Sequence, residues 1–351
     1  MEILDGSQVR QLVDTEQVYA AFRDAQRDHR QRFGGSMAWK TIGGRKYLYR
    51  KVGEGWKSLG AESGDTEQIY ARFHAGRAAL KQRRAKLDAE IGRLAPINRA
   101  MRLGRVPWTS ARVLRRLDRE ALLGQGLRVV GTHALFAYER MAGIHFGSAE
   151  VTTRDIDFLL DARSALKLLT SDLRETGLAG LLRAVDRSFV PTDQGSFRAV
   201  NDTGFMVDLI TPLPRSASIA KSRRRIGNDP GDLEAVENAS LAWLENSPAV
   251  EQMAIDEKGY PLTIVAPDPR AFAMHKLWLS GRDDRDRAKR HRDLAQAEAV
   301  TAMVIEYLPH LRFDDAVLNG IPASLRRESQ ALATRSSQSF RPGRDDETWS
   351  D

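Results

Sequence analysis

The chain contains no cysteine among its 351 residues. Without thiols it cannot form disulfide frameworks, thiolate zinc sites or a cysteine nucleophile. The absence is consistent with a reducing compartment, and we expect a cytoplasmic protein. The chain starts Met-Glu-Ile-Leu-Asp-Gly rather than with a basic and then apolar segment, so we expect no secretory signal.

Long apolar runs are also missing. No stretch approaches the roughly 18 apolar residues of a membrane span, so no membrane association is expected. The hydrophobic fraction is 42% and the charged fraction 29%, as is typical of globular chains. A chain of 351 residues can form two or three domains.

Acidic residues are the scarcer charged type, with 47 Asp and Glu against 54 Lys and Arg and a net charge of +7. The excess is uneven, because residues 71–120 hold fourteen basic and four acidic residues. Such a bias suits a polyanionic partner or a phosphorylated ligand.

The first 120 residues are predicted to form two helices around a small β-meander. Apolar spacing predicts helices over residues 8–33 and 66–95, and Pro96 should open the connection that follows the second helix. Short β-type runs flank Gly43-Gly44 and indicate a meander over about residues 36–60.

The second helix carries a narrow apolar seam with a seven-residue repeat, formed by Phe73, Leu80, Leu87 and Leu94. Gly76 lies on the same seam and should weaken it. The seam predicts either an antiparallel hairpin with the first helix or a homodimer through these helices. The Lys and Arg residues around it form either a solvated face or a track for RNA or phosphate.

The meander mixes basic residues with Trp39, Tyr47, Tyr49 and Trp56. Aromatic and basic side chains together can bind nucleic acid. The simpler interpretation is that the rings form the core of a minimal sheet and the charges solvate its outer face, and we favour it from the sequence.

The centre of the chain contains a pair of carboxylates one residue apart, Asp155 and Asp157, at the start of an apolar run. On a strand, residues i and i+2 point to the same face, so both carboxylates should project together. Adjacent carboxylates repel, and a divalent cation such as Mg²⁺ relieves this. Asp-x-Asp at a strand end is also common without a metal.

A third carboxylate strengthens the prediction of a metal site. Asp208 is the only charge in the apolar run of residues 205–210, where an unpaired carboxylate is costly to bury. Before the Asp pair, residues 127–130 read as a strand that leads through Gly131-Thr132-His133 into a helix. A turn of small residues at a helix N-terminus can bind phosphate through its free N–H groups.

The remaining chain is predicted to be mainly helical. Helices are expected at residues 109–124, 163–176, 271–280 and 285–307, with Lys276 in the third and a Lys289–Asp293 ion pair in the last. The run from Lys221 to Arg225 reads as a surface loop or a polyanion contact.

We therefore predict an α+β fold in which a mixed sheet is flanked by helices. The expected parts are a basic helical hairpin with its meander, a central core, a mainly helical C-terminal region and a disordered tail, over residues 1–120, 121–215, 216–330 and 331–351.

Three motifs carry a resemblance to a known superfamily. They are Val130-Gly131-Thr132-His133-Ala134-Leu135, Thr153-Arg154-Asp155-Ile156-Asp157 and Val207-Asp208-Leu209-Ile210. In this order they resemble the DNA-polymerase-β-like nucleotidyltransferase superfamily, and more narrowly its bacterial stand-alone members. The chain is more distantly similar to nucleotidyltransferase toxins of abortive-infection systems. Thr132 stands where the superfamily has Gly or Ser, and His133 where Asn is expected.

The resemblance implies a transfer of NMP from an NTP to an acceptor hydroxyl, with pyrophosphate release and Mg²⁺, or Mn²⁺, as cofactor. The acceptor is RNA (tRNA included), a protein or a small molecule. The implied catalytic and metal-binding residues are Asp155, Asp157 and Asp208, and the implied nucleotide-binding residues are Gly131, Thr132, His133 and Lys276. The alternatives are a non-catalytic or regulatory protein with this fold, such as a nucleic-acid-binding or toxin–antitoxin component, and a metal-dependent phosphohydrolase or nuclease.

Overall fold

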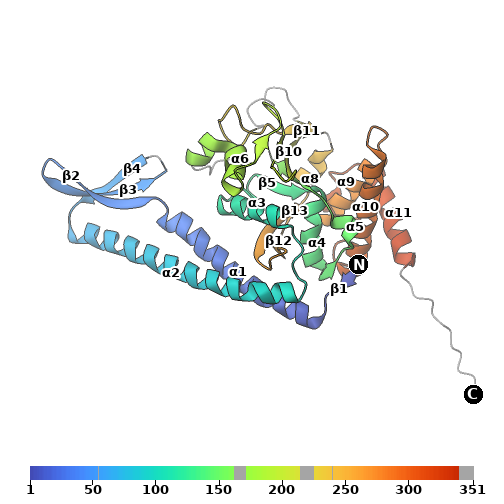
Figure 1. The fold of residues 1–351 in the computed structure, drawn as a ribbon, viewed down its shortest axis with the longest axis horizontal. Helices are drawn as coiled ribbons and strands as arrows, with labels where there is room; N and C mark the ends of the chain where they lie inside the picture. Colours follow the sequence, from blue (N-terminus) through green and yellow to red (C-terminus); the bar gives the residue numbers. More distant parts are fainter. Residues whose placement is uncertain (54, 162–170, 214–224, 239, 340–351) are drawn as a thin grey trace, which may run out of the picture.

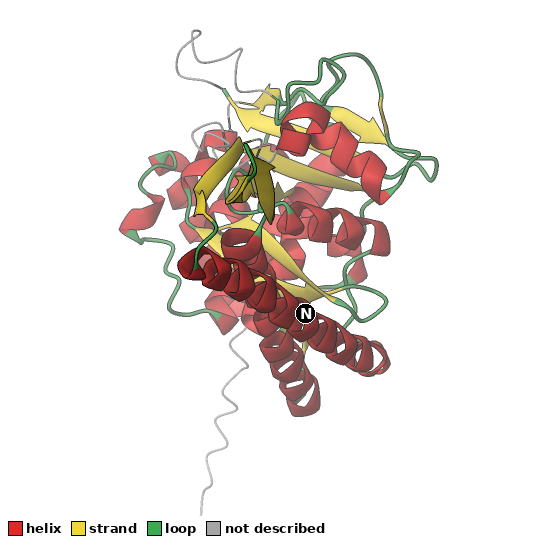
Figure 2. Ribbon diagram, turned by 90° about the vertical axis from the view of Figure 1, so that its left-hand side faces the viewer, coloured by secondary structure: helices red, strands yellow, loops and turns green. Residues whose placement is uncertain are grey.

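The computed structural model describes residues 1–53, 55–161, 171–213, 225–238 and 240–339. The molecule consists of a rounded α/β body and a helical arm that projects from it, with a small sheet at the arm's far end (Figure 1). Figure 2 views the molecule from the free end of the arm. The predicted α+β class is confirmed.

The arm is the predicted antiparallel hairpin. Helix α1 (Gly6–Phe33) runs outwards and α2 (Gly64–Ala100) returns, each starting at a capping box. Helix α2 continues through Pro96, so the predicted break at this residue is wrong. Tertiary contacts hold the last turn, because the buried Asn98 donates to the carbonyl of Gly259 (2.8 Å) and accepts from Gln11 (2.8 Å).

The apolar seam of α2 packs within the chain. The Phe33 and Phe73 rings lie 5.7 Å apart, and a Cβ at Gly76 would lie 2.4 Å from the Phe33 ring. Gly76 thus makes room for an aromatic ring of α1 rather than weakening the contact. The hairpin is confirmed, and the homodimer through these helices stays a prediction.

The meander at the end of the arm is also confirmed, with antiparallel strands β2 (Ser36–Ile42), β3 (Arg45–Val52) and β4 (Gly55–Ala61). Gly43 and Gly44 both have positive φ (57° and 74°), as a two-residue hairpin turn of type I′ requires.

The body is built on a six-stranded mixed sheet in which β7 (Asp155–Leu160) and β10 (Met206–Pro212) are central and parallel. The order is β5-β7-β10-β9-β8, and β11 pairs in parallel with β10. The outer strands are β5 (Leu127–Val130), β8 (Val190–Pro191), β9 (Arg198–Val200) and β11 (Val236–Asn238).

Helices and two short sheets surround this sheet. The first short sheet pairs β1 (Glu2–Ile3) with β6 (Ile144–His145), and the second pairs β12 (Ala249–Ile255) with β13 (Pro261–Pro267). The helical elements are α3 (Trp108–Arg119), η1 (Gly131–Ala134), α4 (Leu135–Ala142), α5 (Ser148–Val151), α6 (Ser171–Val185), α8 (Leu241–Asn246), α9 (Pro269–Ser280), α10 (Arg287–Tyr307), η3 (Ala316–Leu318) and α11 (Ala323–Ser339).

One continuous hydrophobic core runs through the body, from Val106 on the approach to α3 to Leu325 in α11. A separate cluster joins the base of the arm to the body, where Leu12 and Ile91 pack with Ile255 of β12. The hydroxyl groups of Tyr19 and Thr263 lie 3.1 Å apart across the same junction.

The C-terminal segment differs from the prediction. Helix α11 continues to Ser339, so the predicted disorder is wrong for residues 331–339. Leu325 and Ser329 are buried and Ala333 packs on the core, at i, i+4 and i+8 of one helical face. Residues 340–351, most of the predicted 163–176 helix and residues 221–224 of the basic run lie outside the described residues. Among the residues that are described, no helix is both long and apolar enough to cross a membrane.

Candidate active site

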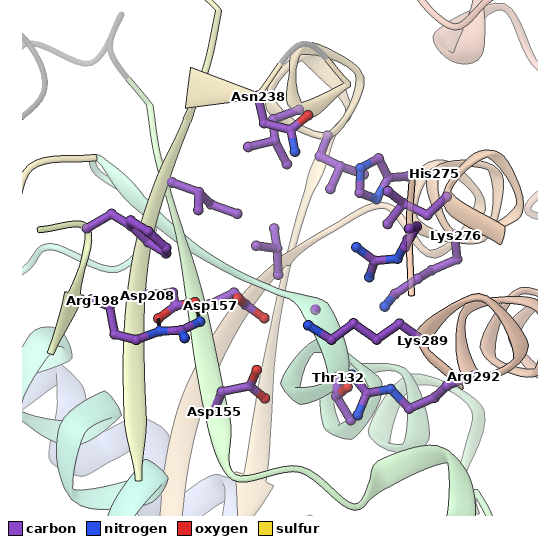
Figure 3. A pocket seen from close by; sticks show the side chains of 18 residues that line it. Thr132, Asp155, Asp157, Arg198, Asp208, Asn238, His275, Lys276, Lys289 and Arg292 are labelled. Atoms are coloured by element: carbon purple, nitrogen blue, oxygen red, sulfur yellow. Dashed lines mark hydrogen bonds and ion pairs between the residues drawn. The ribbon is translucent and has the colours of Figure 1, made fainter. Parts of the chain in front are cut away.

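The three predicted carboxylates lie on one face of the central sheet. Asp155 and Asp157 occupy positions i and i+2 of β7, and Asp157 is the register partner of Asp208 in β10. Register partners in a sheet point to the same side, so the carboxylates of both strands line one cavity (Figure 3). We call these three residues the acidic wall.

Gly131 is required by the acidic wall. The residue has a φ of +65°, and a Cβ at this position would lie 2.2 Å from Oδ2 of Asp157. Glycine therefore permits both the left-handed backbone and the approach of the carboxylate. Strand β5 ends here, and the η1 turn passes into α4, as the sequence predicted.

Asp157 occupies an unfavourable environment for a charge. Burial together with the neighbouring carboxylates of Asp155 and Asp208 raises the pKa of Asp157 to about 7. Lys276 and Arg198 act in the opposite direction but do not cancel this effect. The acidic wall therefore holds more negative charge than the protein itself neutralises, which favours a bound cation.

Asp208 is not free to join the other two carboxylates. Arg198, its register partner in β9, donates from Nε to Oδ1 (2.7 Å) and from Nη2 to Oδ2 (2.6 Å). Within the part of the chain that the structure describes, no group of three or more His, Cys, Asp or Glu side chains is arranged to hold a metal ion. The Arg198 fork occupies both oxygens of the third carboxylate.

The carboxylate oxygens of the acidic wall suit Mg²⁺ or Mn²⁺. Asp155 and Asp157 are the pair that fits such an ion, since Asp157 lacks sufficient compensating charge. Asp208 can contribute only if Arg198 releases one of its oxygens.

The opposite side of the cavity is basic. Helices α9 and α10 and the residues between them supply Lys276, Arg285, Lys289 and Arg292, which we call the basic wall. Lys289 and Arg292 are three residues apart on α10, a helical-face spacing that sequence reasoning could have used. Of the four residues of the basic wall, sequence reasoning identified only Lys276 as a nucleotide contact.

Lys276 and Asp293 form a buried ion pair with an N–O distance of 2.7 Å. Arg285 donates to the second oxygen of Asp293. The predicted Lys289–Asp293 pair is therefore wrong, because Asp293 faces α9 rather than its own helix surface. Burial lowers the pKa of Lys276, and the charge of Asp293 opposes that shift.

Lys289 and Arg292 extend from α10 into the cavity (Figure 3). Neither forms an ion pair with any residue in the described ranges, and Nε of Arg292 is buried without a hydrogen-bond partner there. The basic wall thus offers positive charge that no carboxylate of the described chain neutralises.

The turn residues Thr132 and His133 have different surroundings. Thr132 lines the cavity, and its hydroxyl accepts a hydrogen bond from Gln296 (3.2 Å). His133 is fully buried, lies 2.6 Å from the Ser110 hydroxyl and is not among the cavity-lining residues. Burial lowers the pKa of His133 to about 4, so the ring is neutral and acts in packing between α3 and the turn.

The far end of the cavity is apolar. Its lining includes side chains from β10, α8 and α9, namely Ile210, Leu241, Leu244 and Leu279. Asn238 and His275 lie at this end (Figure 3), and the His275 ring is 3.0 Å from the Ser240 hydroxyl. The cavity volume is ≈ 320 Å³, within the range of small-molecule sites.

A protein-family model described as Nucleotidyltransferase matches residues 109–321, more than half of the chain. The matched region contains both walls of the cavity and begins after the arm. No curated protein and no solved structure shows significant similarity to the chain.

Proposed function

This chain belongs to the nucleotidyltransferase family, and from that premise we propose that it transfers a nucleoside monophosphate from an NTP to an acceptor hydroxyl. The observation that carries the proposal is a single cavity with an acidic wall on β7 and β10 and a basic wall on α9 and α10. Carboxylates opposite unpaired cations suit a metal-bound polyphosphate, because each wall complements one part of it.

Asp155 and Asp157 would hold the divalent cation typical of this family, Mg²⁺ or Mn²⁺. When bound, the cation supplies charge neutralisation for the phosphates and polarises the phosphoryl oxygens. The excess negative charge around Asp157 supports this assignment.

The phosphates would lie between the two walls. Lys289 and Arg292 would donate to phosphate oxygens, and the backbone N–H groups of Gly131 and Thr132 would contribute further donors. Lys276 would add positive charge from its fixed position beside Asp293. The nucleoside would extend to the apolar end, where Leu241 and Leu244 offer a surface for the base.

In the transfer step, the acceptor oxygen forms a bond to the α-phosphorus while the bond from that phosphorus to the β-phosphate bridging oxygen breaks. Pyrophosphate leaves, and a carboxylate takes the hydroxyl proton. Asp208 is the predicted base, and Arg198 must first release one of its oxygens. The remaining contribution of the protein is positioning and electrostatic stabilisation.

The Arg198–Asp208 fork also supports a second candidate function. A carboxylate that is permanently neutralised by arginine has no catalytic use, so a non-catalytic or regulatory protein with this fold is the alternative. Such a protein would bind nucleotide in the same cavity without transferring it. An Arg198→Ala variant separates the two, because it frees Asp208 in an enzyme and changes nothing catalytic in a regulator.

The test uses each ribonucleoside triphosphate labelled at the α-phosphate, incubated with Mg²⁺, the protein and a cell extract. Transfer to any acceptor by the wild type, and not by Asp155→Asn/Asp157→Asn, supports the enzyme. Asp202→Asn is the matched control, since this exposed aspartate lies between β9 and β10 outside the cavity. Mg²⁺-dependent NTP binding without transfer supports the regulatory alternative, and neither binding nor transfer refutes both.

A further inference from the structure

The small sheet at the end of the arm has two chemically different faces. Strand register assigns Met37, Leu48 and Arg50 to the inner face, where Met37 and Leu48 are buried against Phe73 of α2. Register assigns Tyr47, Tyr49 and Trp56 to the other face, together with Lys40, Arg45 and Lys51. We call these last six residues the outer face.

The rings of the outer face do not form the core of the meander. Of the four aromatic residues in this sheet, Trp39 packs inwards, with its ring 5.9 Å from that of Tyr70 in α2. Trp56 is 41% exposed, and Tyr47 and Tyr49 are half-buried at the sheet surface. The interpretation that we favoured from the sequence is therefore wrong for three of the four rings, which lie among the charges.

Positive charge is interleaved with these rings. The Lys40 amine lies 3.8 Å from the Trp56 ring centroid and 5.1 Å from that of Tyr49. Residues 36–61 contain six Lys or Arg and one Glu. Among the described residues, no carboxylate forms an ion pair with Lys40, Arg45 or Lys51, whereas Lys46 on the inner face pairs with Glu62 (3.1 Å).

We propose that the outer face binds single-stranded nucleic acid, with bases stacking on Tyr47, Tyr49 and Trp56 and phosphates contacting Lys40, Arg45 and Lys51. Unpaired cations between rings at the sheet surface fit this ligand because each nucleotide presents both a base face and a phosphate. A protein partner or a second copy of the chain fits less well, since lysine is depleted in protein interfaces and two basic faces repel.

The position of the outer face adds to the argument. Helix α2 has 37 residues, so the arm is roughly 55 Å long at 1.5 Å per residue. A ligand that engages both the outer face and the cavity must be a polymer. This inference rests on the proposed function only in that the bound strand would be the transferase's acceptor; the binding itself does not require catalysis.

The binding experiment uses the full chain and a fluorescent single-stranded oligoribonucleotide of mixed sequence. The same sequence as DNA and as an RNA duplex completes the set, and anisotropy is followed at increasing KCl. We expect single strands to bind at least tenfold more tightly than the duplex. RNA above DNA would identify RNA as the ligand, and equal affinities would leave single strands of either kind.

The variants test the rings and the charges separately. Trp56→Ala and Tyr49→Ala should each weaken binding by at least about fivefold, as loss of one stacked base predicts. Lys51→Ala should reduce the slope of log Kd against log salt by about 0.7. Tyr260→Ala, a similarly exposed tyrosine on the body (39%), and Lys57→Ala, on the inner face of β4, are the matched controls.

The proposal is overturned if single strands do not bind, if the duplex binds equally well, or if Trp56→Ala and Tyr49→Ala bind like the controls. Circular dichroism and thermal unfolding confirm that each variant is folded. Asp155→Asn should bind RNA like the wild type, so failure of nucleotidyl transfer and failure of RNA binding are distinguishable.

Discussion

The cavity and the outer face of the meander both combine charged and uncharged side chains, but they hold their charges differently. In the cavity, Lys276 is buried against Asp293 and Asp208 is held by Arg198. On the outer face, Lys40 lies over the Trp56 and Tyr49 rings, and Lys51 is exposed. These paired cavity charges are fixed by interactions in a low-dielectric environment, whereas those of the outer face are accessible.

The difference has a physical consequence for mutation. Removing one partner of a buried pair leaves a charge without compensation, which is costly to the fold. Removing an exposed lysine changes little in the folded state, because water already solvates it. Substitutions of the paired charges in the cavity should therefore affect stability and activity together, and those on the outer face should affect binding alone.

The acidic wall gives the largest expected effect. Asp155→Asn and Asp157→Asn should each reduce nucleotidyl transfer by about 10³-fold, in the range found when a preorganised electrostatic group is lost. Label transfer from the preferred NTP measures the effect, with Asp202→Asn as the control. A rate within tenfold of the wild type in either variant would refute the role of these carboxylates.

For substitution of Asp157, we expect activity and stability to change in opposite directions. Its pKa is raised to about 7, so its ionised form opposes folding at pH values above the ordinary carboxyl range. In EDTA, the contribution of Asp157 to the stability of the wild type, measured as the difference between the wild type and Asp157→Asn, should therefore decrease as the pH rises from 4 through 7. Asp157→Asn should be the more stable protein at pH 8, even though it is inactive.

The buried cation of the basic wall should give the next largest effect. Lys276→Met leaves Asp293 in the interior with Arg285 as its remaining partner, and should lower the free energy of unfolding by about 3 kcal/mol. Lys46→Met, which removes an exposed pair with Glu62 on the arm, should cost less than about 1 kcal/mol. Urea unfolding measures both, and equal losses would show that burial does not distinguish the two pairs.

The acidic wall and its turn were predictable from the sequence because they depend on local periodicity. Asp155 and Asp157 share a face through strand alternation, and a glycine at position 131 marks a tight turn. The facing basic wall depends on how α9 and α10 pack over the sheet, which no local pattern specifies. The Arg198 fork depends on the antiparallel register of β9 and β10, and is equally non-local.

The arm also shows which features a local sequence pattern predicts and which it does not. Helical periodicity predicted both helices, but their contacts decide the details: Gly76 admits the Phe33 ring, and Asn98 holds α2 helical beyond Pro96. In the meander, strand boundaries followed from Gly43-Gly44. Which rings face solvent depends on which face of the small sheet packs on α2, and tertiary contacts determine this.

The neutral histidine at the apolar end of the cavity gives a smaller and pH-dependent effect. Burial lowers the pKa of His275 to about 3, from an ordinary value of 6.5. The unfolded chain then binds the proton more readily, so stability is present above pH 6.5 and decreases as the pH falls towards 3. At pH 5 the loss is about 2 kcal/mol, because 1.5 pH units correspond to about 1.4 kcal/mol each.

His275→Gln should remove this part of the pH dependence. The measured quantity is the difference in the free energy of unfolding between pH 8 and pH 5, compared between wild type and variant, so that any constant packing cost cancels. The other buried histidine, His133, contributes equally to both proteins. An unchanged pH difference in the variant would show that His275 is not responsible for it.

The unpaired cations of α10 give the smallest expected effect and the sharpest test of the comparison, because they lie in the cavity yet resemble the lysines of the outer face. Lys289 is exposed and forms no ion pair with described residues, so Lys289→Met should leave the unfolding midpoint unchanged. It should weaken Mg²⁺–NTP binding about tenfold, equivalent to about 1.4 kcal/mol for one charge-assisted contact. Arg287→Met, on the same helix and outside the cavity, is the control, and calorimetric titration measures both. If Lys289→Met bound NTP like Arg287→Met, the phosphates would not lie against α10. If Lys289→Met lowered the stability instead, exposure to solvent would no longer distinguish the charges that bind a ligand from the charges that stabilise the fold.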